Sequence, residues 1–235
     1  MKKVLGALAG IVVLAGIAIF LLLSNINGIV KNLVESVGSD VTGTSVSLGS
    51  ADIDLRTGKG TLLGLTVSNP DGYGGGEAFE VSEITLEIDV YSIGKNPLII
   101  NQIVVDGATV NYIGVGNKSN LQTILDNVKS GGSSGSDADS GGGSSGSDML
   151  LIIDDFRFTD ASMSVALTGV PEASKTLVMQ DVTATGVGRD KNGVPPAEAT
   201  AIILQPVLQR AVRAAADELS KNGLDRFMDK VKDAF

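Results

Sequence analysis

The pattern of apolar and polar positions changes along the chain, and each change predicts a different element. From Val4 to Leu23 no polar side chain occurs, and a run of about 20 residues matches the thickness of a bilayer core at the helical rise. We therefore predict a transmembrane helix over residues 1–23. Because Lys2 and Lys3 precede the run, the positive-inside rule places the N-terminus in the cytoplasm and the rest of a single-pass chain across the membrane.

Residues 24–38 keep a helical spacing of apolar side chains but add charges. Apolar residues recur three and four positions apart: Ile26, Ile29, Val30, Leu33 and Val34. This spacing is typical of an amphipathic helix, and Gly38 is a residue type that often ends helices. We predict a helical stalk over residues 24–38.

From Val41 the period changes to two, which is typical of half-buried antiparallel strands. The clearest alternation separates four apolar side chains by acidic residues and threonine: Ile84, Leu86, Ile88 and Val90. We predict that these four face an apolar groove. A short amphipathic helix over residues 119–129, with Ser119 as its N-cap, completes a β-rich part over residues 39–129.

Residues 130–148 contain only serine, glycine, aspartate and one alanine. Such a segment has no apolar area to bury, so we predict a disordered linker. The alternative is an acidic calcium loop built from Asp137, Asp139 and Asp148, but the regular spacing of calcium-binding repeats is missing.

Strands resume over residues 149–235 and are followed by two predicted helices, 197–220 and 224–235, with Pro206 expected to kink or restart the first. The segment from Ile100 to Val110 also aligns with the segment from Ile153 to Met163, at an offset of 53 residues. Each segment has the pattern of two strands separated by a dipeptide, which is Asp106-Gly107 in the first segment and Asp160-Ala161 in the second. We therefore predict that the strands after the linker continue the first sheet, and the alternative is two independent domains.

These elements define an α+β fold. We expect an N-terminal transmembrane helix, then an antiparallel, strand-rich curved sheet, with C-terminal amphipathic helices packed on the sheet.

The amino-acid composition excludes several kinds of binding partner, metal site and catalytic group. The 235-residue chain has a formal net charge of −9 and contains neither cysteine nor histidine. The negative charge argues against nucleic acid as a partner. The missing residue types remove disulfides, thiolate and imidazole metal sites, and the commonest general base. We predict no metal and no cofactor.

The carboxylates offer no catalytic pair. Asp154 and Asp155 are adjacent on a predicted strand, so they face opposite sides of the sheet, and we place Asp160 in a turn. Asp52 and Asp54 share a strand face, which we interpret as the solvated side. The chain is therefore not expected to be an enzyme.

Several segments, taken in order, resemble the N-terminal part of AsmA-like proteins of the bacterial envelope. After the membrane anchor these segments are residues 60–72, the alternating strand 84–90, residues 99–108 and residues 120–125. The resemblance covers roughly residues 1–129 and, more loosely, residues 150–186. The individual motifs are common ones, and their order carries the resemblance.

The resemblance implies an inner-membrane protein with a periplasmic β-rich body that binds phospholipid or supports envelope integrity. The expected partners are the lipid bilayer, phospholipid and other envelope proteins. The chain is shorter than the long family members, so we do not expect it to bridge two membranes. The alternative is a structural or protein-interaction module, a β-sandwich like the water-stress domains, without a lipid groove.

Overall fold

The computed structural model describes residues 25–116, 118–131, 149–167 and 175–232, with backbone only for residues 131 and 222–232. The predicted transmembrane run, with Lys2, Lys3, Val4 and Leu23, lies outside the described residues, as do residues 132–148 of the predicted linker. Among the helices that are described, none is both long enough and apolar enough to cross a bilayer.

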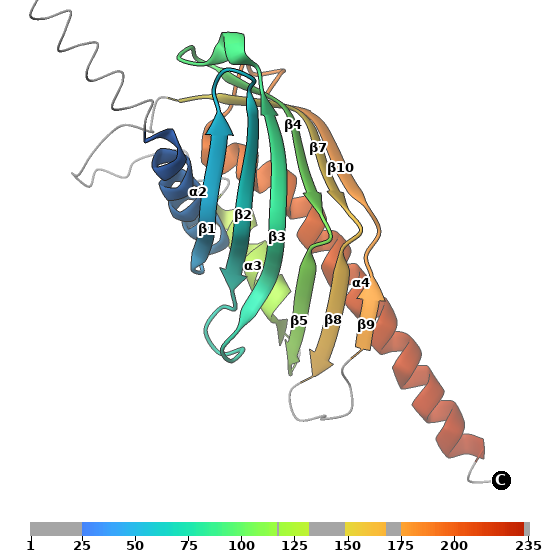
Figure 1. Ribbon diagram of the computed structural model, residues 1–235. Helices are drawn as coiled ribbons and strands as arrows, with labels where there is room; N and C mark the ends of the chain where they lie inside the picture. Colours follow the sequence, from blue (N-terminus) through green and yellow to red (C-terminus); the bar gives the residue numbers. More distant parts are fainter. Residues whose placement is uncertain (1–24, 117, 132–148, 168–174, 233–235) are drawn as a thin grey trace, which may run out of the picture.

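Ten strands form one mixed sheet in the described part of the chain (Figure 1). The strands are β1 (Val46–Asp54), β2 (Lys59–Ser68), β3 (Glu77–Ile88), β4 (Leu98–Asp106), β5 (Thr109–Val115), β6 (Lys118–Ser119), β7 (Leu151–Thr159), β8 (Ser162–Leu167), β9 (Lys175–Val178) and β10 (Val182–Val187). The helices are α2 (Ile26–Thr42), α3 (Asn120–Gly131) and α4 (Pro196–Lys232), and a short 3₁₀ turn, η1, spans Val90–Ser92.

The α+β class is therefore confirmed, but the expected antiparallel sheet is wrong in one respect. β7 pairs with β4, and β8 with β5, in parallel. Both pairs align residues 53 positions apart, as in Ile100 with Ile153 and Val110 with Met163. The two segments that align in the sequence are thus neighbouring strands, since the connection through α3 returns the chain to the same end of the sheet. Because the described strands form one sheet, the expected alternative of a β-sandwich does not hold.

A crease crosses the sheet and gives it its curvature. Along this line pairs of consecutive residues do not point into the core. Three pairs lie within β1, β2 and β3, and three lie where β4 leads to β5, β7 to β8 and β9 to β10: Gly49-Ser50, Leu63-Gly64, Ser82-Glu83, Asp106-Gly107, Thr159-Asp160 and Gln180-Asp181. Gly64, Gly107 and Asp160 have φ values of 65°, 66° and 51° there. Because an extra outward residue reverses the pleat phase, apolar side chains face inward on both sides of the crease.

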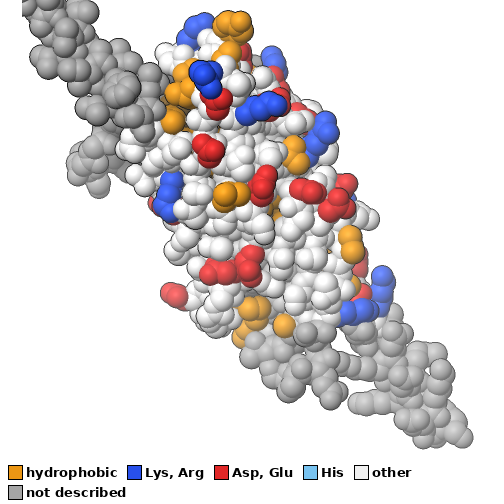
Figure 2. Space-filling model, in the orientation of Figure 1, with side chains coloured by type: hydrophobic (Ala, Val, Ile, Leu, Met, Phe, Trp, Pro, Cys, Tyr) orange, Lys and Arg blue, Asp and Glu red, His pale blue; other side chains and the backbone are white. Residues whose placement is uncertain are grey.

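The helices lie on the inner face of the sheet, and the outer face is solvated. In Figure 1 α4 crosses behind the strands, with α3 behind β2 and β3 and α2 beside β1. Figure 2 shows the outer face, where charged side chains are scattered among small and polar ones. The core therefore lies between the sheet and the helices.

The predicted stalk is instead part of this body. α2 extends past Gly38 to Thr42, and Gly43 ends it in the left-handed conformation at φ 67°. Gly38 allows close packing on β1, because a Cβ there would lie 3.0 Å from Val46 Cγ1. The β-rich part consequently begins with β1 at Val46, not at residue 39.

A polar stripe on α2 covers the free edge of β1. Residues spaced by four along the helix form hydrogen bonds to the strand backbone. Asn27 Oδ1 accepts from Ile53 N at 3.0 Å, Glu35 Oε1 accepts from Leu48 N at 2.8 Å, and Ser39 Oγ accepts from Val46 N at 2.9 Å. Lys31 donates to the Leu48 carbonyl. Since a free edge invites pairing with another strand, these contacts protect it.

The C-terminal helices are one helix, not two. α4 contains Pro206 and continues through Gly223 to Lys232. A proline inside a helix costs about 3 kcal/mol, but the neighbouring Val207 and Leu208 are 1% and 0% exposed. Burying two such side chains contributes about 3–6 kcal/mol, which holds the helix against the sheet across the proline. The predicted packing of residues 224–235 falls on side chains that are not described.

The other boundaries differ by smaller amounts. α3 begins at Asn120, with Ser119 Oγ accepting from Gln122 N at 3.1 Å, as expected for the N-cap. It ends at Gly131 instead of residue 129, so the predicted linker starts two residues too early. β3 ends at Ile88, and Val90 belongs to η1.

Candidate functional site

An apolar cavity lies between the inner face of the sheet and helices α2 and α4. Its volume is about 330 Å³, within the range of small-molecule sites in proteins. α2 contributes Val30, Leu33, Val34 and Val37, and α4 contributes Ala199, Thr200, Ile203, Leu204 and Val207. The strands β1, β2, β3, β4 and β7 supply the opposite wall.

The cavity wall carries almost no polar groups. Its two side-chain hydroxyls belong to Thr42 and Thr200, and no charged residue contributes to the described lining. Thr42 Oγ1 donates to Gly38 O at 2.7 Å, and Thr200 Oγ1 donates to Pro196 O at 2.8 Å. Because both hydroxyl protons are used within their own helices, the wall favours an apolar occupant over water.

The cavity is long in the strand direction. Its wall includes β3 residues from Phe79 to Ile88, and this stretch extends for about 30 Å at the strand rise of roughly 3.3 Å per residue. The wall therefore crosses the crease and follows the curvature of the sheet. An elongated chain fits this shape better than a compact ring system.

Three of the four predicted groove residues lie in the cavity wall. Ile84, Leu86 and Ile88 line it, whereas Val90 does not. The alternation of the sequence continues to Val90, but the Asp89 carboxylate accepts from Tyr91 N at 2.9 Å and starts the η1 turn. The strand face therefore ends two residues earlier than predicted.

The inner face is only partly covered by helices. Leu65, Leu86, Ile88, Ile100 and Ile103 are half-buried although they point toward α2 and α4. By contrast, Ile84 and Phe156 are 6% and 3% exposed. The apolar face of the sheet is thus larger than the helices cover, which is the geometry of a groove and not of a closed core.

One end of the cavity lies at the start of several elements. Leu98 of β4, Leu151 of β7 and Pro196 of α4 belong to its wall, and so does Met149. Leu98 pairs with Leu151, and Leu151 forms an isolated bridge with Val194. We call this the η1 end of the molecule, because η1 connects β3 to β4 there (Figure 1).

Known proteins do not identify a family for this chain. No protein-family model matches it, and no curated protein matches it. Function is therefore inferred from the sequence and from the chemistry of the cavity.

The carboxylates considered from the sequence lie outside the cavity wall. Asp154 pairs with Arg189 at 2.7 Å, and its hydrogen bonds and charge raise the pKa of that guanidinium. Asp155 instead accepts from Gln102 Nε2 at 2.9 Å and pairs with Arg157 at 2.8 Å. The adjacent carboxylates of Asp154 and Asp155 therefore have separate partners.

The remaining acidic candidates belong to turns and exposed strands. The Asp54 carboxylate accepts from Arg56 N at 2.9 Å, and this hydrogen bond is the main cause that lowers the pKa of Asp54. Asp52 is exposed on β1, and Asp160 lies on the crease. Across the described residues, no group of three or more acidic side chains is placed to hold a metal ion.

The sequence alone does not predict the cavity residues on the helices. Its pattern predicts a stalk for the apolar stripe of α2, and it predicts that α4 covers the sheet. A signal was present in the four-residue spacing of Asn27, Lys31, Glu35 and Ser39. Such a polar row beside an apolar stripe is expected where a helix lies along a strand edge.

Proposed function

We propose that this protein is a membrane-anchored protein that binds an elongated apolar ligand of the acyl-chain type in the cavity between the sheet and α2 and α4. The supporting observation is the chemistry of the cavity wall. It is apolar over its described length, and its hydroxyls at Thr42 and Thr200 are bonded within their own helices. A charged headgroup would have to remain outside the cavity, since desolvating an unpaired charge is very costly.

The anchor and the resemblance support a location at a bacterial inner membrane. The run from Val4 to Leu23 directly precedes α2, and a curved sheet with an apolar inner face is what the resemblance to AsmA-like proteins implies. Across its width the sheet has the order β1, β2, β3, then β4 and β5 end to end, then β7 and β8, and then β10 and β9. These positions span about 25–30 Å at a spacing of roughly 4.8 Å. We therefore propose that a single copy acts at one membrane, on phospholipid or its acyl chains.

Binding of saturated fatty acids of increasing length tests this proposal. Each added methylene buried in an apolar site contributes about 0.8 kcal/mol, so two methylenes strengthen binding roughly 15-fold. We expect the dissociation constant of the full chain in detergent to fall with chain length and then level off once the cavity is filled.

Two variants of α4 separate cavity binding from surface adsorption. Ala199→Phe projects a ring into the cavity, and we expect binding to weaken at least tenfold. Ile202→Phe is the matched control, because Ile202 lies on the same helix, is 40% exposed and does not line the cavity. If the fatty acids bind equally to both variants, or do not bind the unmodified chain, the proposal is wrong and the cavity is a packing defect of a structural module.

A further inference from the structure

The loop between β3 and β4 projects an aromatic side chain into solvent. Tyr91, in η1, is 81% exposed. Among the large hydrophobic side chains described, only Val178 on β9 is as exposed, at 84%. Tyrosine has an apolar ring and a polar hydroxyl, so it is suited to the boundary between a membrane and water.

Hydrogen bonds hold this loop in one conformation. The Asp89 carboxylate accepts from Tyr91 N at 2.9 Å. The Ser92 hydroxyl is buried, donates to Asp89 O at 2.7 Å and accepts from Ile99 N at 2.9 Å. Asn96 Oδ1 accepts from Leu150 N at 2.8 Å and attaches the loop to the strand that begins there. The exposure of Tyr91 therefore results from a fixed backbone and not from a disordered loop.

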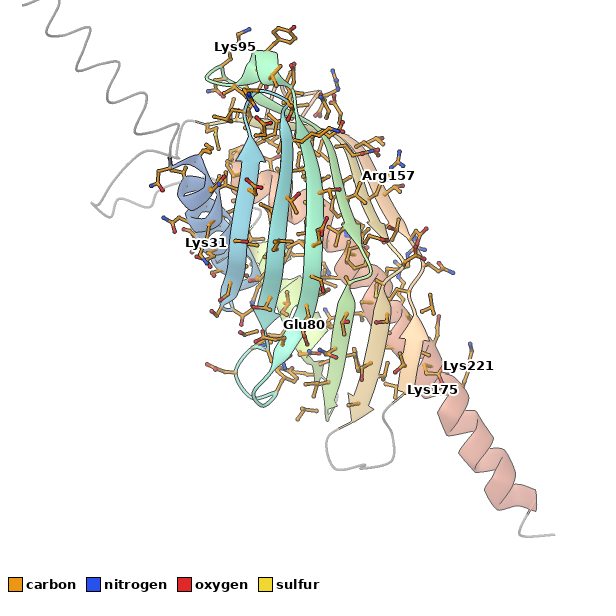
Figure 3. All side chains as sticks on the ribbon, in the orientation of Figure 1. Lys31, Glu80, Lys95, Arg157, Lys175 and Lys221 are labelled. Atoms are coloured by element: carbon orange, nitrogen blue, oxygen red, sulfur yellow. The ribbon has the colours of Figure 1, made fainter. Side chains whose placement is uncertain are left out.

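The start of α2 lies at the same end of the molecule as this loop. Asn27 bonds to Ile53 N at 3.0 Å, near the end of β1. The following turn contacts the end of β3, where Ile88 N donates to Gly58 O at 2.7 Å, and η1 follows directly. In Figure 1 both the start of α2 and η1 lie in the upper part of the view, and Figure 3 labels Lys95 on this loop.

The predicted anchor must lie near this end of the molecule, because few residues separate it from α2. Residues 23 and 26 are three steps apart, so their Cα atoms are separated by at most about 11 Å. If Val4 to Leu23 spans a bilayer, the membrane surface on the outer side therefore lies close to the start of α2. The η1 end of the cavity, with Leu98 and Leu151 in its wall, then faces the same surface.

We propose that the η1 loop is a membrane-contact element, in which Tyr91 enters the headgroup region of the bilayer that holds the anchor and Lys95 lies beside it. The contact turns the η1 end of the cavity toward the bilayer, so that an acyl chain has a short path between the two. This inference rests on the proposed function for the anchor and for the ligand. The partner is the lipid surface itself.

Charge does not drive this contact. The loops at this end carry both cations, such as Arg56 and Lys95, and acidic residues, such as Asp54 and Asp89, and Arg56 pairs with Asp54 at 3.6 Å. Because the signs are mixed, the attraction to a membrane comes mainly from the aromatic ring. The contact is therefore expected to persist at high salt, where exposed charges are screened.

The absence of tryptophan from the chain allows a direct test. Tyr91→Trp introduces a single tryptophan in the loop, and Val178→Trp introduces one at a matched exposure on β9, beyond the crease. Each full-length variant is reconstituted into phosphatidylcholine vesicles with or without bromine on the acyl chains near their carboxyl ends. We expect bromine to quench most of the fluorescence of Tyr91→Trp, at low and at high salt, and to leave that of Val178→Trp unchanged.

Several results would overturn the inference. These are equal fluorescence of Tyr91→Trp in both kinds of vesicle, equal quenching of both variants, quenching that disappears at high salt, or a chain that does not enter the vesicles. Fatty-acid binding in detergent is measured on the same variants. Binding without quenching refutes the membrane contact and leaves the cavity function intact, whereas quenching without binding refutes the cavity function alone.

Discussion

Two buried alanines of α4 are expected to respond in opposite ways to the same substitution. Ala199 is 2% exposed and lines the cavity, whereas Ala211 is 0% exposed and lies in the core away from it. Ala199→Leu places three more carbon atoms in the cavity, worth up to about 2.4 kcal/mol at roughly 0.8 kcal/mol each. Fixing the leucine side chain costs about 0.5–1 kcal/mol. We expect a net stabilisation of about 1.5 kcal/mol.

Ala211→Leu adds the same atoms to a close-packed region. Overpacking of that kind destabilises a protein by about 1–3 kcal/mol. The free energies of unfolding of the two variants should therefore differ by about 2.5–4.5 kcal/mol. The comparison controls for helix propensity, because both substitutions replace alanine by leucine inside the same helix.

Urea unfolding of the full chain in detergent micelles, followed by far-ultraviolet circular dichroism, measures both values. The slope of the transition must be the same in the variants, so that the midpoints report stability. If Ala199→Leu destabilises the chain as much as Ala211→Leu does, the space beside α4 is closed in solution and the reasoning about the cavity fails. Ala199→Leu should also weaken binding of the longest fatty acids.

Three further predictions concern the parts that shape the cavity. The hydrogen bond from Leu48 N, with Lys31 nearby, holds the pKa of Glu35 below its ordinary value of 4.5. The stabilising effect of the ionised Glu35 is therefore present above pH 4.5 and is lost as the pH falls through the lowered pKa. Near pH 7 the urea midpoint of Glu35→Gln should lie below that of the unmodified chain. In acid the two midpoints should approach each other. Gly107→Ala meets no atom within 4 Å but must adopt φ 66°, which should cost about 1–2 kcal/mol; an unchanged midpoint would argue against a strained crease. Asn120 is 0% exposed, and its amide oxygen accepts from Ile113 N and Leu121 N, both at 2.8 Å. Asn120→Ala should therefore lower the free energy of unfolding by at least about 2 kcal/mol, because it leaves buried donors unpaired. A smaller loss of stability in thermal or urea unfolding would contradict that role.

The period-two pattern predicted much of the sheet and part of the cavity wall. Ile84, Leu86 and Ile88 face the cavity as expected, because alternation along a strand is a local property that the pleat imposes. The alignment of two segments at an offset of 53 residues is more informative still, since the same offset is the register of β7 on β4 and of β8 on β5. The pattern did not reveal that the paired segments run parallel, because direction depends on the path of the chain between them.

Sequence reasoning failed where a long-range contact decided the outcome. The local pattern predicts a helix end at Gly38 and two separate C-terminal helices, yet α2 continues past Gly38 and α4 is one helix that contains Pro206. In both places packing on the sheet outweighs a local preference of a few kcal/mol. The alternation of its neighbours predicts that Val90 lies on the strand face, whereas the hydrogen bond from Tyr91 N to the Asp89 carboxylate turns the chain first.

The sequence by itself therefore determined the local properties: an apolar run that precedes an acidic body, the alternation of the strands, and the absence of histidine and cysteine. Tertiary structure alone decided that α2 protects the edge of β1, that the outward pairs of successive strands align into one crease, and that α2 and α4 leave an apolar space. The reason is physical. Periodicity describes which face of an element is apolar, but the volume between two such faces depends on how closely distant elements approach, and no local pattern encodes that distance.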